Sequence, residues 1–258
     1  MTGGPSPRTA RVASTIVGVI AVSTLMGWAY DVGALKTVLP GFVTMKVNTA
    51  LCLLGCSIAL FLQADPDGPR ARARWARAVS AFVATVALAT LAEHIFKVDL
   101  GIDQFFVAAP AEKGSASPGR MAPATATSFA VLSAALALLS SKQRTRRSAV
   151  QVLAVAVLVN GTLVIVGYAI GERALYGLGS YTAPAVHTAF CFLVIAVGII
   201  AARWRARPLR FLDWPLRAKM ATLLVVTSLV PLAMSATTDI RSASSLMTDA
   251  AGDVLKAR

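Results

Sequence analysis

A unit of two apolar segments occurs three times in this chain, and the repeat constrains the fold more than any other sequence feature. The first segment of each copy ends near an aromatic or histidine position, and the second begins at a Thr-Ala pair. These positions are Trp28 and Thr49, His94 and Thr125, and Tyr168 and Thr188. Their separations are 21, 31 and 20 residues, so the middle copy contains an insertion of about ten residues. The repeat predicts three helical hairpins of one orientation around a pseudo-threefold axis.

The amino-acid composition predicts that these hairpins lie in a membrane. The chain is 56% hydrophobic and 14% charged, whereas soluble domains are about 45–50% apolar and about 25% charged. Seven uncharged windows approach or exceed the length that crosses about 30 Å of hydrocarbon. The windows are 12–30, 47–64, 78–92, 121–141, 148–171, 174–202 and 220–238. We therefore predict an all-α integral membrane protein with seven transmembrane helices, six of them forming the three hairpins.

The basic residues predict the orientation of the chain. Four segments that would share one side hold 16 Lys/Arg and 3 acidic residues, whereas the rest of the chain holds 9 of each. These segments are 1–11, 65–77, 142–147 and 203–219. Because cytoplasmic loops carry the excess of Lys and Arg, we expect a multi-pass membrane protein whose N-terminus is cytoplasmic and whose C-terminus lies on the opposite side. The same distribution argues against nucleic-acid binding as the reason for the net charge of +13, and membrane lipids are the expected partners.

The repeat and the charges together predict five regions. They are a cytoplasmic tail (1–11), a six-helix membrane domain (12–203), a basic and aromatic cytoplasmic connector (204–219), a seventh transmembrane helix (220–238) and a periplasmic helical stub (239–258). Trp204 and Trp214 lie among the basic residues of the connector. A headgroup-bound connector is the favoured interpretation of this composition, and a site for signal coupling to a partner is the alternative.

Ionisable residues near the outer helix ends are the candidates for a sensing site. Glu93 occupies a position that is Gly27 and Gly167 in the other copies, and an ionisable residue in a spanning segment is a functional candidate. Its place near the interface suggests that its carboxylate reaches water. Asp99 and Asp103 follow in the longest outer loop, where we expect them to cap a short helix lying on the membrane. These three residues are therefore candidates for sensing a ligand.

His94 and His187 are the only histidines, and both are expected near the outer leaflet, where two histidines could ligate haem or a metal. The repeat favours another interpretation, in which His94 occupies the same interfacial aromatic position as Trp28 and Tyr168. All four residues remain candidates for sensing, and neither a cofactor nor a metal site is predicted. The repeated threonines are expected to bond to carbonyls of their own or a neighbouring helix. We find no catalytic motif, so enzymatic activity stays undecided.

Several strings resemble the multi-pass membrane region at the N-terminus of bacterial sensor histidine kinases and diguanylate cyclases. They include Leu39-Pro-Gly-Phe-Val-Thr-Met-Lys-Val-Asn-Thr-Ala-Leu-Cys52, Val98-Asp-Leu-Gly-Ile-Asp-Gln104 and Ser117-Pro-Gly-Arg-Met-Ala-Pro-Ala-Thr-Ala126. The segment Leu175-Tyr-Gly-Leu-Gly-Ser-Tyr-Thr182, leading to His187-Thr-Ala189, is a further match. The chain differs at Val47 and Ala124, where the family pattern has Pro and Asn. The resemblance covers about residues 12–203, and residues 215–258 are similar to the helices that precede Cache-type periplasmic sensor domains.

The resemblance implies a membrane-embedded sensory input module of a two-component or cyclic-di-GMP receptor. It also implies the bacterial inner membrane, with a periplasmic C-terminus, and a truncated form that lacks the catalytic output domain. A homodimer and a downstream kinase or cyclase are the implied partners. In a longer protein, the implied enzyme is a sensor histidine kinase. The alternative from the repeat itself is a small transporter or channel, because parallel repeats also occur in transporters.

Overall fold

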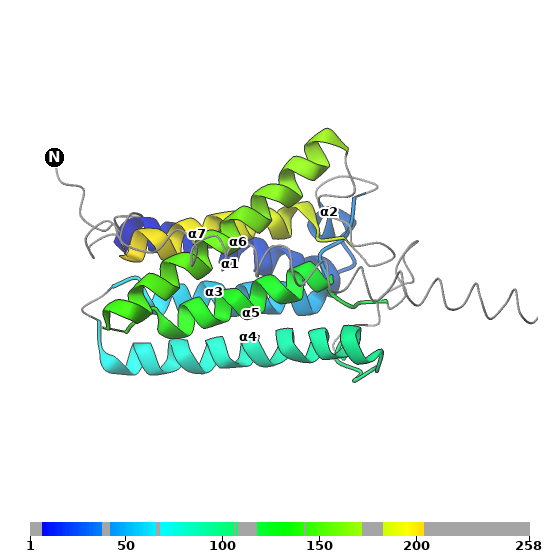
Figure 1. The fold of residues 1–258 in the computed structure, drawn as a ribbon. Coiled ribbons are helices and arrows are strands. Elements are labelled where there is room, and N and C mark those ends of the chain that lie inside the picture. The colour runs from blue at the N-terminus through cyan, green and yellow to red at the C-terminus, as the bar shows by residue number, and fades with distance from the viewer. Residues whose placement is uncertain are drawn as a thin grey trace, which may run out of the picture.

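The computed structural model describes residues 7–37, 42–65, 68–105, 107, 118–141, 143–171 and 183–203. Within these ranges the regular structure is entirely helical, and most of the long helices run side by side in one bundle (Figure 1). The helices are α1 (Pro7–Ala29), α2 (Gly33–Lys36), α3 (Val47–Gln63), α4 (Arg70–Phe96), α5 (Pro123–Leu138), α6 (Arg144–Ile170) and α7 (Val186–Arg203). The all-α prediction is therefore confirmed for the described part of the chain.

The six long helices coincide with the first six predicted apolar segments, and α2 is a single turn in the link after α1. The structure begins α1, α4 and α6 earlier than predicted, because all three helices include basic residues that we had assigned to the tail or to loops. Arginine is a good helix former, and Arg77 donates from Nε to the carbonyl of Ala73 within α4. The predicted connector, seventh transmembrane helix and periplasmic stub lie outside the described residues.

Helix length separates the six long helices into two sets. Three segments are long and apolar enough to cross a membrane, namely Pro7–Ala29, Arg70–Phe96 and Ser148–Ile170. The other three apolar helices are shorter, namely Val47–Gln63, Pro123–Leu138 and Val186–Ala202. In chain order, and leaving out the single turn α2, each of the three longer helices is followed by one of the three shorter ones. This composition is compatible with a membrane protein.

The six main helices form a closed ring of neighbouring pairs, and α3, α5 and α7 lie on the inner side of this ring. Each long or short helix packs against the next one along the chain, and α7 returns to pack against α1. The short helices α3, α5 and α7 also contact one another. Phe129 of α5 and Phe192 of α7 meet there edge to face, with ring centroids 5.0 Å apart. The largest buried side chains come mainly from these three helices, so the core of the bundle is formed by the segments that begin at the Thr-Ala pairs.

Small and polar residues bring neighbouring helices close together. A Cβ atom added to Gly55 of α3 would lie 2.8 Å from Cγ2 of Val83 in α4. Between α3 and α5, Gln63 donates from Nε2 to the carbonyl of Leu136 at 3.0 Å. Such contacts hold helices together where apolar burial gives little preference for protein over lipid.

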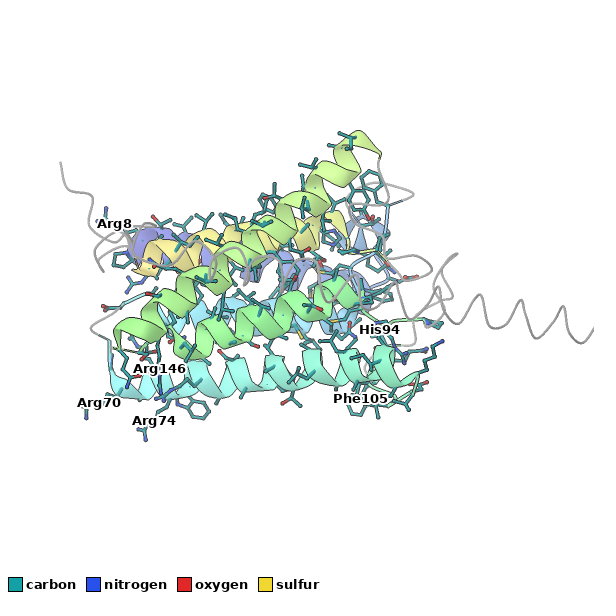
Figure 2. All side chains as sticks on the ribbon, viewed as in Figure 1. Arg8, Arg70, Arg74, His94, Phe105 and Arg146 are labelled. Carbon is teal, nitrogen blue, oxygen red and sulfur yellow. The ribbon has the colours of Figure 1, made fainter. Side chains whose placement is uncertain are left out.

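The two ends of the bundle differ in charge. Arg8, Arg70, Arg74 and Arg146 lie at one end, whereas His94 and Phe105 lie at the other (Figure 2). We call these the arginine end and the His94 end. Large apolar side chains, including Phe82 and Leu88 of α4, are exposed on the outer faces of the helices.

Candidate functional site

Glu93 is the most deeply buried of the predicted site residues. It lies in the last turns of α4, at the His94 end, and has no exposed surface. Its Oε1 accepts a hydrogen bond from the backbone N–H of Leu100 at 2.9 Å. Our expectation that this carboxylate reaches water is therefore wrong, because the link after α4 folds back over it. A buried carboxylate is costly unless other charges or donors stabilise it.

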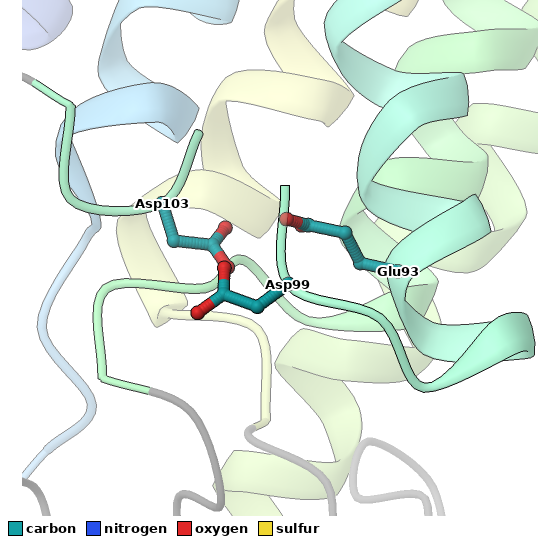
Figure 3. Close-up of side chains that lie close together, drawn as sticks. All are labelled: Glu93, Asp99 and Asp103. Carbon is teal, nitrogen blue, oxygen red and sulfur yellow. The ribbon is translucent and has the colours of Figure 1, made fainter. Parts of the chain in front are cut away.

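Arg120 supplies the charge that Glu93 needs. Its Nε lies 3.4 Å from Oε2 of Glu93 and 2.5 Å from Oδ2 of Asp103, and all three side chains are buried. Its Nη2 lies 3.6 Å from Oδ1 of Asp99. We call Glu93, Asp99, Asp103 and Arg120 the Arg120 cluster. Figure 3 shows its three carboxylates directed toward one another from α4 and the following link.

The backbone around Arg120 makes this close approach possible. Gly119 has a φ of +78°, and a Cβ at this position would lie only 2.7 Å from the carbonyl oxygen of Asp103. Only glycine adopts this conformation readily and also tolerates such a contact. Asp103 additionally accepts a hydrogen bond at 3.4 Å from Nδ2 of Asn48, in the first turn of α3. The cluster thus ties together the end of α4, the start of α3 and the segment before α5.

The electrostatics of the cluster favour protons more than a metal ion. The cluster contains three carboxyl groups and a single guanidinium, so full ionisation would leave excess negative charge in a buried site. Burial raises the pKa of Asp103 above its usual value, while the hydrogen bond and the charge of Arg120 act in the opposite direction. The three carboxylates could offer oxygens within 4.8 Å of one another to a cation. The guanidinium of Arg120 already lies against each of these carboxylates.

Asp99 stays at the surface, with its side chain 80% exposed. It accepts a hydrogen bond from the backbone N–H of Gly101 at 2.9 Å, as aspartate commonly does in a turn. The described residues 97–105 contain no helix. The expectation that Asp99 and Asp103 cap a short helix on the membrane is therefore wrong, because Asp99 caps a turn and Asp103 binds Arg120.

The three aromatic-type positions of the repeat make equivalent hydrogen bonds. Trp28 donates from Nε1 to the carbonyl of Met45 at 2.8 Å, and the hydroxyl of Tyr168 donates to the carbonyl of Pro184 at 3.0 Å. Nε2 of His94 lies 3.0 Å from the carbonyl of Met121, so this nitrogen carries the proton. Each acceptor is the residue four positions before the repeated threonine. These side chains thus hold in place the backbone that leads into α3, α5 and α7.

We expect Tyr168→Phe to lower the free energy of unfolding by about 1–3 kcal/mol, because it leaves the buried carbonyl of Pro184 without its donor. Tyr30→Phe is the matched control, since Tyr30 is 70% exposed and its hydroxyl is free to bond to water. Thermal unfolding of both variants measures the difference. Equal stability of the two variants would contradict a structural role for the Tyr168 hydroxyl.

His187 lies in the first turn of α7. Both of its ring nitrogens are buried and have no hydrogen-bond partner among the described residues. Because His94 uses Nε2 for the carbonyl of Met121, that nitrogen is not available to a ligand shared with His187. The predicted signal-coupling residues Trp204 and Trp214 lie outside the described residues.

The repeated threonines occupy one equivalent position, the third residue of α3, α5 and α7. Thr49, Thr125 and Thr188 are 3%, 2% and 1% exposed. Their hydroxyls make no hydrogen bond with any described residue, contrary to our expectation. The hydroxyls of Thr24, Thr85 and Thr127 behave differently, since each bonds to the carbonyl four residues earlier.

Comparison of the chain with family models, with curated proteins and with solved structures found no match.

Proposed function

We propose that residues 7–203 form the membrane-embedded sensory input domain of a bacterial signal-transduction receptor. In this proposal, α1 with α3, α4 with α5, and α6 with α7 are three repeated hairpins around a pseudo-threefold axis. The closed ring of helices and its centre of α3, α5 and α7 support this arrangement. The three equivalent hydrogen bonds of Trp28, His94 and Tyr168 support it independently.

The proposed location is the bacterial inner membrane, with the axis along the membrane normal. Its support comes from the apolar helices of spanning length and from the large apolar side chains on the outer faces of the bundle. Arginines gather at one end of the bundle (Figure 2). By the positive-inside rule the arginine end is cytoplasmic, and the His94 end faces the periplasm.

The main support for a sensory function is the position and charge of the Arg120 cluster. It lies at the proposed periplasmic end and joins the middle hairpin to the start of α3 through Asp103 and Asn48. An event that favours one protonation or packing state of Glu93 would shift the position of one hairpin against the next. A stimulus shifts such an equilibrium only to the extent that it interacts more favourably with one of the two states. The proposed output partner, a kinase or cyclase, would respond to this shift.

The test is a receptor in which this chain precedes a histidine-kinase output. Glu93→Gln removes one buried charge while keeping the size of the side chain, and we expect it to change basal kinase activity by about fivefold or more, as typical coupling energies give. Asp31→Asn is the control, because the side chain of Asp31 is 94% exposed and forms an ion pair with Lys36 outside the cluster. Autophosphorylation of the purified receptors in lipid measures the effect. Equal activity of wild type and Glu93→Gln would refute a sensory role for the cluster.

A further inference from the structure

A small cavity lies where the first turns of α3, α5 and α7 meet. All three repeated threonines line it, and so do Lys46 and Arg120. About 10 Å³ is open to the centre of a water-sized particle, which is room for roughly one such particle. The three helices begin at their lining residues and run away from it toward the arginine end. The cavity is thus a common point for three helix N-termini.

Helix N-termini give this cavity a positive potential. The first N–H groups of a helix have no partner within that helix, and the helix dipole places partial positive charge there. Neither α3 nor α5 has a side-chain hydrogen bond at its N-cap. With 17, 16 and 18 residues, all three helices are long enough to carry a substantial dipole. Their combined N-termini favour a negative charge at this point.

The lining side chains strengthen that preference. Lys46 and Arg120 are 4% and 8% exposed, and none of the described residues that line the cavity is acidic. The charge of Arg120 is offset by the carboxylates of its cluster, which do not line the cavity, so Lys46 is the cationic group that most favours an anion here. Buried cationic groups are stabilised by a nearby anion.

The hydroxyls of the repeated threonines are an independent indication of a ligand. Buried hydroxyls are normally hydrogen-bonded, yet Thr49, Thr125 and Thr188 have no partner among the described residues. The carbonyls of Met45, Met121 and Pro184 already accept from Trp28, His94 and Tyr168. Each threonine hydroxyl can donate a hydrogen bond into the cavity, and donors on three sides suit an acceptor that carries negative charge.

We propose that this cavity binds a single monatomic anion of halide size, held by the hydroxyls of Thr49, Thr125 and Thr188 beneath Lys46 and Arg120. A polyatomic anion such as sulfate exceeds the available volume. Water fits the volume but matches the cationic environment less well, because it presents hydrogens as well as lone pairs. The inference does not depend on the signalling function, since anion binding is measured without an output domain.

The test compares thermal unfolding of the purified chain in sodium bromide, chloride, sulfate and gluconate at equal ionic strength. A ligand that binds only the folded state raises the unfolding temperature with its concentration. We expect bromide and chloride to stabilise the protein in a saturable way, and sulfate and gluconate not to. The absence of a halide-specific shift in the wild-type protein would overturn the proposal.

Variants locate the site. The triple variant Thr49→Val, Thr125→Val, Thr188→Val keeps the side-chain shape and removes the three donors, and we expect it to bind bromide about tenfold or more weakly. The matched control is Thr24→Val, Thr85→Val, Thr127→Val, whose hydroxyls bond to their own helices and whose loss should leave bromide affinity unchanged. Lys46→Met should also weaken binding, and it decides alone if the triple variant does not fold. Unchanged halide affinity in Lys46→Met, or equal loss in the control, would overturn the assignment to this cavity.

Discussion

Arg120→Met is expected to lower the free energy of unfolding by about 3–5 kcal/mol, which is the usual cost of removing one partner from a buried ion pair. Glu93 and Asp103 are both buried, and each has Arg120 as its cationic neighbour. Without the guanidinium the two carboxyl groups would remain close together in a site that water does not reach. The damage should include the link between α4 and α5, because Arg120 also donates to the carbonyl of Val98 at 3.5 Å.

Two comparisons separate this effect from loss of side-chain packing. Adding Glu93→Gln to Arg120→Met should recover part of the lost stability, because the amide removes one of the two buried charges. Asp31→Asn is the surface control, since the side chain of Asp31 is 94% exposed, and surface ion pairs contribute little. Thermal unfolding in a constant detergent gives all the values. If Arg120→Met unfolds at the same temperature as Asp31→Asn, the buried cluster does not stabilise the fold.

The helices of this protein were largely predictable because uncharged windows are a strong signal. The window 47–64 corresponds to α3 (Val47–Gln63). The window 148–171 ends one residue after the last residue of α6 (Arg144–Ile170). The starts of α4 and α6 were missed for a physical reason. A run of arginines reads as a loop when charge alone is considered, yet arginine favours the helix and extends both helices past the apolar segment.

The candidate site was predicted only in part. Glu93 was found because an ionisable residue in an apolar helix has few explanations, and its neighbours Asp99 and Asp103 were found with it. Arg120 was missed, although it is the partner of all three. It lies 27 residues after Glu93, and no periodicity relates residues across an irregular link. A charged residue directly before Met121, where the second segment of the middle copy begins, was the available signal.

The repeated threonines were aligned correctly from the sequence, but the hydrogen bonds expected of their hydroxyls were wrong. Their equivalent positions were visible in the sequence, and a bond to a helix carbonyl was the ordinary inference. Thr24 bonds to the carbonyl four residues earlier within α1. Thr49 is the third residue of α3, so the carbonyl four residues earlier belongs to the link before the helix, and it accepts from Trp28.

Gly198→Leu is expected to lower the free energy of unfolding by about 3 kcal/mol, at the upper end of the usual cost of overpacking a core. A Cβ at Gly198 of α7 would lie 2.8 Å from Cβ of Ala13 in α1 and 2.8 Å from Cδ2 of Leu60 in α3. The Leu60 methyl group can turn aside, but the Cβ of Ala13 moves only with its helix. A larger side chain must therefore push α7 away from α1.

The neighbouring residue provides a matched control. Val197 is 47% exposed and faces outward, so Val197→Leu adds a similar side chain to the same turn of α7 without entering the bundle. We expect Val197→Leu to unfold like the wild-type protein and Gly198→Ala to fall between wild type and Gly198→Leu. Thermal unfolding of the three variants gives the order. If Gly198→Leu unfolds at the same temperature as Val197→Leu, α7 does not pack against α1 and α3 as closely as the structure shows.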